Sequence, residues 1–321
     1  MVHSPNQHSS RKPKRLFYEA LLVLAAAIWG LATVSIKNVL PVMEPSWLTG
    51  VRFLSAGIIL AAVFAPRFAR EARRGQMRDH LIAGLALGLF TALAYLLNTT
   101  GLTDTTAAKS SFLTAVYCVL APFLAWAALR KKPTAFNLVA AVVCLTGVGL
   151  VALAGAASDA APTDGGTFGL SLTWGDLITL GSAVFYAFEV VGGSVFVPGK
   201  DAGCITAIQF LVAGAITCAF AAATQTPPNP QALADPWILA NLAFLVVGAT
   251  CITMFFQNVG MAHTEPATGA LLLSTESVFG ALFGVMLLGD PITPLTGAGF
   301  ALIFASILVS EWLPLRLSRG A

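Results

Sequence analysis

The sequence predicts an all-helical membrane protein of ten transmembrane helices, built as two inverted repeats of five helices. Three observations support this fold class: the composition, a series of apolar runs, and the one-sided placement of basic residues. Of the 321 residues, 57% are hydrophobic and only 10% are charged. Soluble domains carry about a quarter charged residues, so this chain cannot cover its own surface in water.

The apolar runs each approach the roughly 20 residues that a helix needs to cross the hydrocarbon core. They are too long and too continuous for the strands of a membrane barrel. The runs cover residues 17–36, 46–64, 80–100, 107–128, 135–154, 173–195, 203–223, 237–258, 267–288 and 294–313. The predicted division is a tail 1–15, a first repeat 16–155, an external linker 156–172, a second repeat 173–314 and a tail 315–321.

Basic residues occur in every second connection if ten helices are counted. The fifteen on this side are Arg11, Lys12, Lys14, Arg15, Arg67, Arg70, Arg73, Arg74, Arg78, Arg130, Lys131, Lys132, Lys200, Arg316 and Arg319. The opposite connections carry Glu44, Asp104, Asp159, Asp164, Asp235 and Asp290. Because cytoplasmic loops are rich in Lys and Arg, we expect an inner-membrane protein with both termini in the cytoplasm.

The two halves of the chain are similar to each other. Aligning Gly101 with Gly260 pairs Asn98 with Gln257. Further pairs are Thr105–Thr264, Ala108–Ala267, Leu113–Leu272, Val119–Val278, Leu129–Leu288 and Thr134–Thr293, with Arg52-Phe53 opposite Gln209-Phe210 at nearly the same offset. Five helices in each half force the second half to enter the membrane from the other side, as in the inverted repeats of many secondary transporters.

Short sequence pieces add to this order of helices. They are Ile28-Trp29-Gly30 with Lys37, Val51-Arg52-Phe53, Asn98-Thr99-Thr100-Gly101-Leu102, Thr105 with Ala107-Ala108, Pro122, Thr264-Glu265-Pro266-Ala267 and Glu276. Together they resemble the EamA-like branch of the drug/metabolite transporter superfamily over nearly the whole chain after the tail.

The resemblance implies an alternating-access carrier with a cavity lined by helices 1–4 and 6–9. It also implies that helices 5 and 10 lie at the periphery, at the seam where some relatives form dimers. Relatives often carry a Glu-Pro pair in the middle of helix 9, where this chain has Glu276-Ser277. A role that depends on a kink at that proline is therefore not expected here.

Five of the charged side chains within or near predicted spans are candidate functional residues, because a charge at the centre of a span costs about 3 kcal/mol. Glu276 is predicted to be a coupling residue, as a proton site or a counter-charge to a cationic substrate group, and Glu189 is the second candidate. The alternatives are a neutral structural carboxyl for Glu276 and a snorkelling or vestibule position for Glu189. Lys37, Arg52 and Lys109 predict an electropositive funnel for carboxylate or phosphate groups. The alternatives are that the lysines snorkel and that Arg52 is structural and pairs with Glu44 or Asp104.

Substrate-binding candidates are the aromatic and amide side chains of the predicted cavity helices, together with Arg52. Cavities for organic ligands are mostly apolar and aromatic, with a few polar anchors. The candidates are Trp29, Tyr95, Asn98, Tyr117, Phe185, Tyr186 and Gln257, with Trp126 and Phe256 as further aromatic residues. Ordinary packing remains the alternative for each aromatic residue, and hydrogen bonding between helices remains the alternative for the two amides.

Enzyme motifs, phosphate loops and metal-ligand spacings are missing from the sequence, and the five cysteines form no CxxC. No cofactor, metal or nucleic-acid partner is therefore predicted. The favoured function is a secondary transporter of small metabolites, coupled to protons or a counter-substrate, and the resemblance suggests export of amino acids or related compounds. An antiporter or importer of a drug, nucleoside or sugar derivative is the first alternative, and a membrane-embedded enzyme or scaffold is the second.

The predicted topology is testable with single cysteines introduced at Ser158 and Arg73 in a chain that lacks the five native cysteines. A membrane-impermeant maleimide should label Ser158→Cys from outside and Arg73→Cys only after the membrane is opened, because the basic connections lie inside. Labelling of Ser158→Cys from the cytoplasmic side alone would contradict the ten-helix count.

Overall fold

The computed structural model describes residues 11–130, 132–158, 172–264 and 266–313, and its regular structure over these ranges is entirely helical. The first half contains α1 (Arg11–Val39), α2 (Pro45–Val63), α3 (Ala65–Arg73), α4 (Met77–Gly101), α5 (Ala107–Ala115), α6 (Tyr117–Leu129) and α7 (Ala135–Ser158). The second half contains α8 (Trp174–Phe196), α9 (Ala202–Thr224), α10 (Pro230–Leu233), α11 (Pro236–Ala243), η1 (Phe244–Ile252), α12 (Thr253–His263), α13 (Pro266–Ser274), α14 (Glu276–Phe283), η2 (Gly284–Leu288), α15 (Pro294–Ile307) and η3 (Leu308–Trp312).

Eight helical stretches among the described residues are long and apolar enough to cross a membrane. They are Leu16–Val39, Pro45–Val63, Met77–Gly101, Ala107–Leu129, Trp174–Phe196, Ala202–Thr224, Pro236–Met261 and Leu271–Leu288. Two shorter apolar helices cover Ala135–Val151 and Pro294–Ser310. The all-helical, multi-pass prediction is confirmed, whereas the count of ten spans and the inverted relation of the halves stay predictions.

The helices of the two halves pack against each other over most of the bundle. Helix α2 lies along α9, α4 lies between α8 and α9, and α1 runs along α12, α13 and α14. A core cluster joins Phe53 and Leu60 of α2 to Phe210 of α9 and Val246 of η1. Burial of these apolar side chains fixes α2, α9 and η1 around the centre of the molecule.

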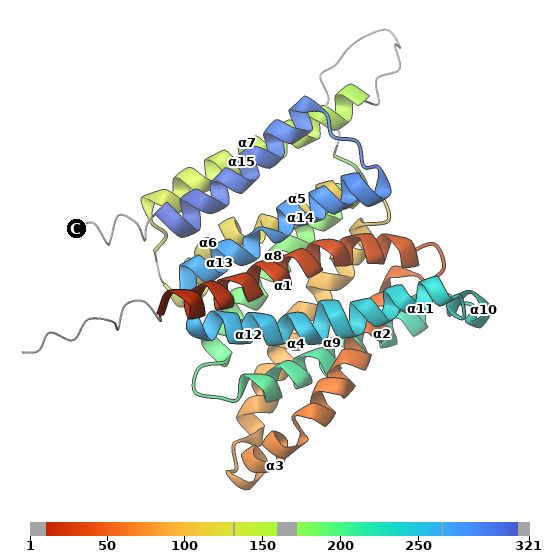
Figure 1. Cartoon of the computed structure of the whole chain (residues 1–321), viewed down its shortest axis with the longest axis vertical. Helices are drawn as coiled ribbons and strands as arrows, with labels where there is room; N and C mark the ends of the chain where they lie inside the picture. Colours follow the sequence, from red (N-terminus) through yellow and green to blue (C-terminus); the bar gives the residue numbers. More distant parts are fainter. Residues whose placement is uncertain (1–10, 131, 159–171, 265, 314–321) are drawn as a thin grey trace, which may run out of the picture.

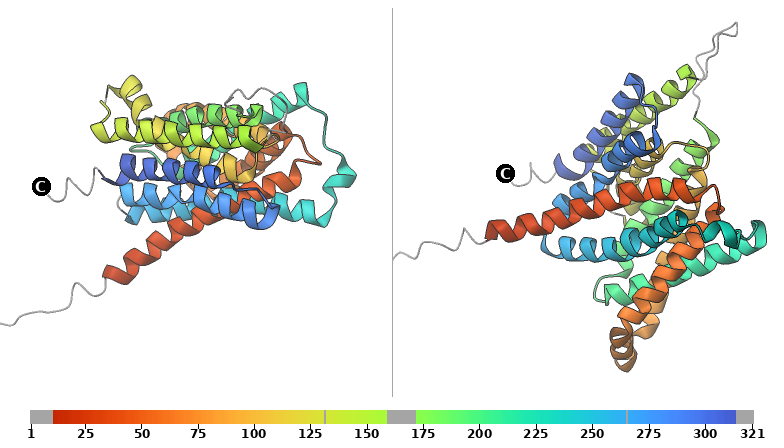
Figure 2. Two further views of the ribbon diagram at one scale, coloured as in Figure 1. Left: turned by 90° about the horizontal axis from the view of Figure 1, so that it is seen from above. Right: turned by 45° about the vertical axis from the view of Figure 1, so that its right-hand side comes forward.

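Helices α7 and α15 form a pair at one edge of the bundle (Figure 1, and the right-hand view of Figure 2). Their contact is close because Gly147 and Gly299 face each other, and a Cβ on either would collide with the other's carbonyl oxygen. Small residues allow such an approach between membrane helices. This edge position agrees with the peripheral place that the resemblance implies for helices 5 and 10.

Two of the membrane-crossing stretches are interrupted, one near its centre and one near its start. One breaks at Val116, between α5 and α6, and Pro122 lies inside α6. The other breaks at Thr275, between α13 and α14, without any proline. There the hydroxyls of Ser274 and Thr275 donate to the carbonyls of Leu271 and Leu272. Such bonds from hydroxyl side chains to the preceding turn bend helices, so a break precedes Glu276 even though Ser277 replaces the proline of relatives.

Helix α3 lies in a segment that the sequence pattern left as a connection. Phe64 and Phe68 pack on the α2–α9 core and Glu71 is buried, whereas most of the arginines are exposed. A helix of nine residues with one apolar edge is too short and too charged for a search based on long apolar runs.

Candidate functional site

A cavity of about 370 Å³ lies between the two halves, within the range of pockets that hold small organic ligands. Its walls come from α1, α2, α4, α5, α6, α8, α9, α12, α13 and α14. Nine of the predicted site residues line it: Trp29, Arg52, Tyr95, Asn98, Tyr117, Tyr186, Glu189, Gln257 and Glu276. Phe185, Lys37 and Lys109 are not among the lining residues.

Arg52 is the buried cation of this cavity, with 4% of its surface exposed. Its Nε donates to the hydroxyl of Thr250 at 2.9 Å, and Nη2 donates to the carbonyl of Ala249 at 3.3 Å. The guanidinium also lies 5.3 Å from the Phe53 ring centre and 5.4 Å from that of Tyr95. Of its five N–H groups, two are bonded within the described chain, so others remain for a ligand.

Glu44 and Asp104 are the partners expected if Arg52 is structural, and this expectation is wrong. Glu44 accepts a hydrogen bond from Thr226, and Asp104 accepts one from the backbone N–H of Gly175. Both acids lie in connections beyond the helix ends, whereas Arg52 is inside α2. A buried arginine side chain satisfies its donors from the helices that it touches.

The carbonyl of Ala249 lies in η1, a π-helical stretch in which the regular helix ladder is altered. This carbonyl also accepts the indole N–H of Trp29 at 2.9 Å. Thr250 bonds back to the carbonyl of Leu245 at 2.7 Å, which orients its hydroxyl oxygen toward Arg52. One turn of the second half therefore positions Trp29 and Arg52, two cavity residues of the first half.

Gln209 binds the carboxylate of Glu189, one of the two acidic residues that line the cavity. Its side-chain amide donates to Glu189 at 2.7 Å and to the hydroxyl of Thr91 at 2.8 Å. Gln209 is buried and itself lines the cavity. The Glu189 carboxyl is thus held in place by a neutral donor rather than by a cation.

Glu276 is the first residue of α14 and faces the same cavity. Among the described residues it forms no hydrogen bond or ion pair, and it interacts electrostatically with Arg52. A carboxylate at the start of a helix is favoured by the N-terminal end of the helix dipole. Its oxygens are therefore available to a ligand or a proton.

Aromatic side chains form the wall between these charged groups. The Tyr95 ring lies 4.6 Å from Phe53 and 5.0 Å from Tyr186, centre to centre. Tyr117 follows at 6.0 Å from Tyr186. Edge-to-face contacts of this kind stabilise a fixed aromatic surface. Three other aromatic candidates pack outside the cavity lining: Phe185, Trp126 and Phe256.

Asn98 and Gln257 line the cavity from equivalent places in the two halves. The Asn98 amide donates to the hydroxyl of Thr114 at 2.7 Å and so joins α4 to α5. The two predicted roles of this amide, lining and helix–helix bonding, therefore occur together.

The two lysines of the predicted funnel lie away from the cavity lining. Lys109 forms an ion pair with Asp176 at 3.3 Å, and Asp176 is fully buried. Lys37 lies half-buried in the last turn of α1. Because the charge of Lys109 is matched by a carboxylate, its attraction for an anion at the cavity is reduced.

The two ends of the cavity differ. At one end the lining reaches Gly193, Val197 and Ala202, beside the connection between α8 and α9. Beyond the other end, hydrogen bonds join connections of the two halves: Asp104 to Gly175, Thr173 to the Asp104 carbonyl, Thr105 to Asp176, and Ala108 to Asp290. Connections of the two halves are also bonded at the α8–α9 end, where Asp201 bonds Arg70 and His80.

Sequence reasoning missed Thr91, Thr250 and the Ala249 carbonyl as parts of this site. A signal for the threonines was present, since the alignment that pairs Gly101 with Gly260 also pairs Thr91 with Thr250. The role of the carbonyl depends on the backbone of η1, which side-chain patterns do not encode.

The fold and the cavity define a class: a multi-pass membrane protein with a ligand-sized chamber between two helical halves. A family model described as the EamA-like transporter family matches residues 16–153 and again residues 173–312. The chain therefore belongs to the EamA-like transporter family.

One curated relative agrees with this assignment, and one solved structure shares the fold. An uncharacterized transporter of Archaeoglobus fulgidus is 28% identical over 298 residues, which cover 92% of this chain and 87% of that protein. A crystal structure of another protein matches with a TM-score of 0.60 and 18% identity, covering 95% of this chain and 99% of the other. The second likeness shows the fold alone.

Proposed function

We propose that this membrane transporter is a secondary carrier that exports amino acids or related small metabolites by alternating access. The observation that carries the proposal is the cavity between the halves, where Arg52, Glu276 and Glu189 face one space beside an aromatic wall. Burial of three ionisable groups in membrane helices is costly and marks a pathway for polar substrates.

The internal symmetry of the site supports the inverted repeat and the ten-span count. Thr91 and Thr250, which are equivalent in the alignment of the halves, bond Gln209 and Arg52, which are also near-equivalent. The helix breaks at Val116 and Thr275 differ by the same offset as Gly101 and Gly260. Helices α7 and α15 complete five spans in each half. Matched halves of this kind rock against each other around a central site in many carriers.

The charges of the cavity suit a substrate with a carboxylate and an amine. Free N–H groups of Arg52 can bind a carboxylate through two parallel hydrogen bonds. Glu276, which has free oxygens, can bind the ammonium group, and the rings of Trp29, Tyr95 and Tyr186 can contact the side chain. The second half contributes the neutral Gln209 where the first contributes Arg52, so the site has one anion-binding end.

The proposed orientation supports export. The basic connections favour a cytoplasmic position for the α8–α9 corner, and the cavity lining reaches that corner at Val197 and Ala202. A substrate would enter from inside, and the bonded connections at the other end would have to open to release it. Proton binding at Glu276 as the substrate leaves would supply coupling to an ion gradient.

Proteoliposome uptake of labelled amino acids, nucleosides and cationic drugs, with and without a pH gradient, tests the substrate class and the role of Arg52. We expect saturable transport of amino acids, weakened by Arg52→Lys and more strongly by Arg52→Gln, because Lys cannot reproduce the two-pronged geometry. An ester of the substrate should compete poorly. The matched control is Lys132→Gln, an exposed basic residue remote from the cavity lining. Normal competition by the ester, with reduced thermal stability of the Arg52 variants, would show a purely structural arginine.

Glu276→Gln should abolish or change the pH dependence of transport while the protein stays inserted and folded, because the amide keeps the shape of the side chain and cannot take up a proton. The measurement is gradient-driven uptake between about pH 5 and 8, the range in which a perturbed carboxyl can titrate. Glu44→Gln, which changes an exposed carboxyl, serves as the control. Unchanged gradient-driven transport in Glu276→Gln would refute the proton site and leave Glu189 as the next candidate.

A further inference from the structure

Exposed apolar side chains occur on α2 and on α3. Ile58 and Val63 of α2 are 56% and 63% exposed, and Pro66 and Ala69 of α3 are exposed as well. Exposed apolar side chains of a membrane-crossing helix contact lipid chains. Pro66 and Ala69 also line a groove together with Arg70, Arg73 and Arg74, which we call the α3 arginine groove.

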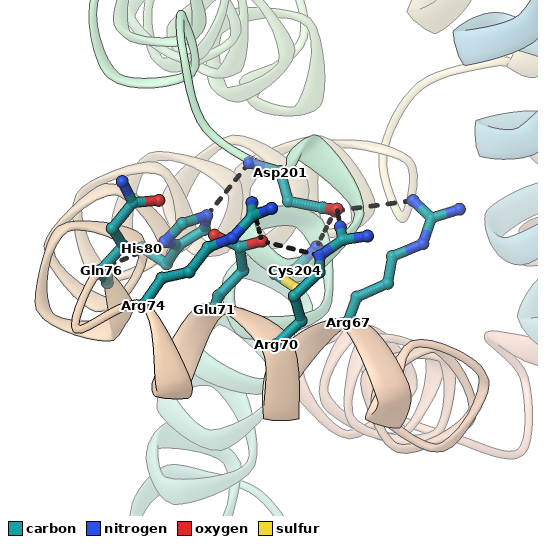
Figure 3. Close-up of polar contacts among 8 residues, drawn as sticks. All are labelled: Arg67, Arg70, Glu71, Arg74, Gln76, His80, Asp201 and Cys204. Carbon is teal, nitrogen blue, oxygen red and sulfur yellow. Dashed lines mark hydrogen bonds and ion pairs between the residues drawn. The ribbon is translucent and has the colours of Figure 1, made fainter.

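Arg67, Arg70 and Arg74 are held in place by buried or partly buried acids (Figure 3). Arg70 bonds Glu71 through Nε and Asp201 through Nη2, both at 3.1 Å. Arg74 bonds Glu71 at 3.2 Å, and the Glu71 side chain is 4% exposed. The guanidinium groups are about half exposed, so they keep outward N–H groups while their positions are fixed. Such pre-organisation lowers the entropic cost of binding a ligand.

Positive charge is in excess around this groove. Residues 65–79 contain five arginines, at positions 67, 70, 73, 74 and 78, against Glu71 and Asp79. With Asp201 included, five positive and three negative charges leave an excess of two. Arg73 is exposed and has no hydrogen bond or ion pair within the described part of the chain. Its charge is therefore available to an external anion.

We propose that the α3 arginine groove binds the headgroup of an anionic phospholipid, with an acyl chain along the exposed face of α2. The inference uses the proposed orientation, which places α3 at the cytoplasmic surface, where anionic lipids attract basic segments. Arginine binds phosphate oxygens through paired N–H donors. The apolar face at Ile58 and Val63 favours a lipid over a soluble phosphate, because only a lipid fills both parts.

The groove lies close to the α8–α9 end of the cavity. Asp201, which Arg70 and Arg67 bond, directly precedes Ala202 of the cavity lining. His80 accepts a hydrogen bond from the backbone N–H of Asp201 at 3.0 Å. A headgroup in the groove would therefore lie beside the α8–α9 connection, where substrate is proposed to enter.

The test is native mass spectrometry of the full chain in detergent, titrated with phosphatidylglycerol or phosphatidylcholine of identical acyl chains. We expect phosphatidylglycerol adducts at concentrations where phosphatidylcholine gives none. Arg73→Gln should weaken them about fivefold, the effect of one basic residue at a lipid surface. The variant keeps its fold, since the Arg73 side chain bonds no described residue. Lys132→Gln, another exposed basic residue, should bind lipid like the unchanged protein.

Equal binding of the two lipids, or equal phosphatidylglycerol binding by Arg73→Gln and the unchanged chain, would overturn the proposal. Millimolar inorganic phosphate should leave the adducts in place, and complete displacement by it would show a simple anion site instead. Because lipid binding in detergent is measured without transport, failure of this test leaves the transport proposal standing, and failure of transport leaves this one standing.

Discussion

The site depends on one contact, the docking of Arg52 from α2 onto the π-helical turn of η1. A guanidinium inside a membrane helix requires partners, because leaving its donors unpaired costs several kcal/mol. Thr250 and the Ala249 carbonyl supply them, and the same carbonyl holds Trp29. The contact fixes α1 and α2 of the first half against the second half. Tyr95 packs on Phe53 beside Arg52, so the aromatic wall follows from the same arrangement.

On the opposite side of the cavity a similar contact is made by a neutral side chain in place of the arginine. Gln209 takes the place of Arg52 and Thr91 takes that of Thr250, while Glu189 accepts the second amide bond. The two halves thus use nearly equivalent hydrogen bonds to hold different side chains, Arg52 and Gln209, in the same cavity. A symmetric fold can rock between two states, and its asymmetric charges can orient a substrate that carries both a carboxylate and an amine.

The apolar runs, the basic connections and most of the lining residues could be predicted from the sequence, since hydropathy and charge within a span are local properties. Arg52 and Glu276 were identifiable because charges are rare in such helices. The partners of Arg52 were not, because they depend on a backbone distortion in η1 and on helix contacts far apart in the chain. The partner of Lys109 was not predictable for a related reason, because Asp176, which pairs with it, lies 67 residues away.

The most direct test of alternating access is a reversible cross-link at the end of the cavity opposite the α8–α9 connection. Asp104 and Thr173, which are hydrogen-bonded across the halves, can be replaced by cysteines in a chain without native cysteines and joined by a bis(methanethiosulfonate) cross-linker, whose two disulfides a reducing agent cleaves. Alternating access predicts that the cross-linked protein still binds substrate but does not transport it, and that cleavage restores transport. Transport by the cross-linked protein at the rate of the cleaved one would contradict a mechanism in which this end must open.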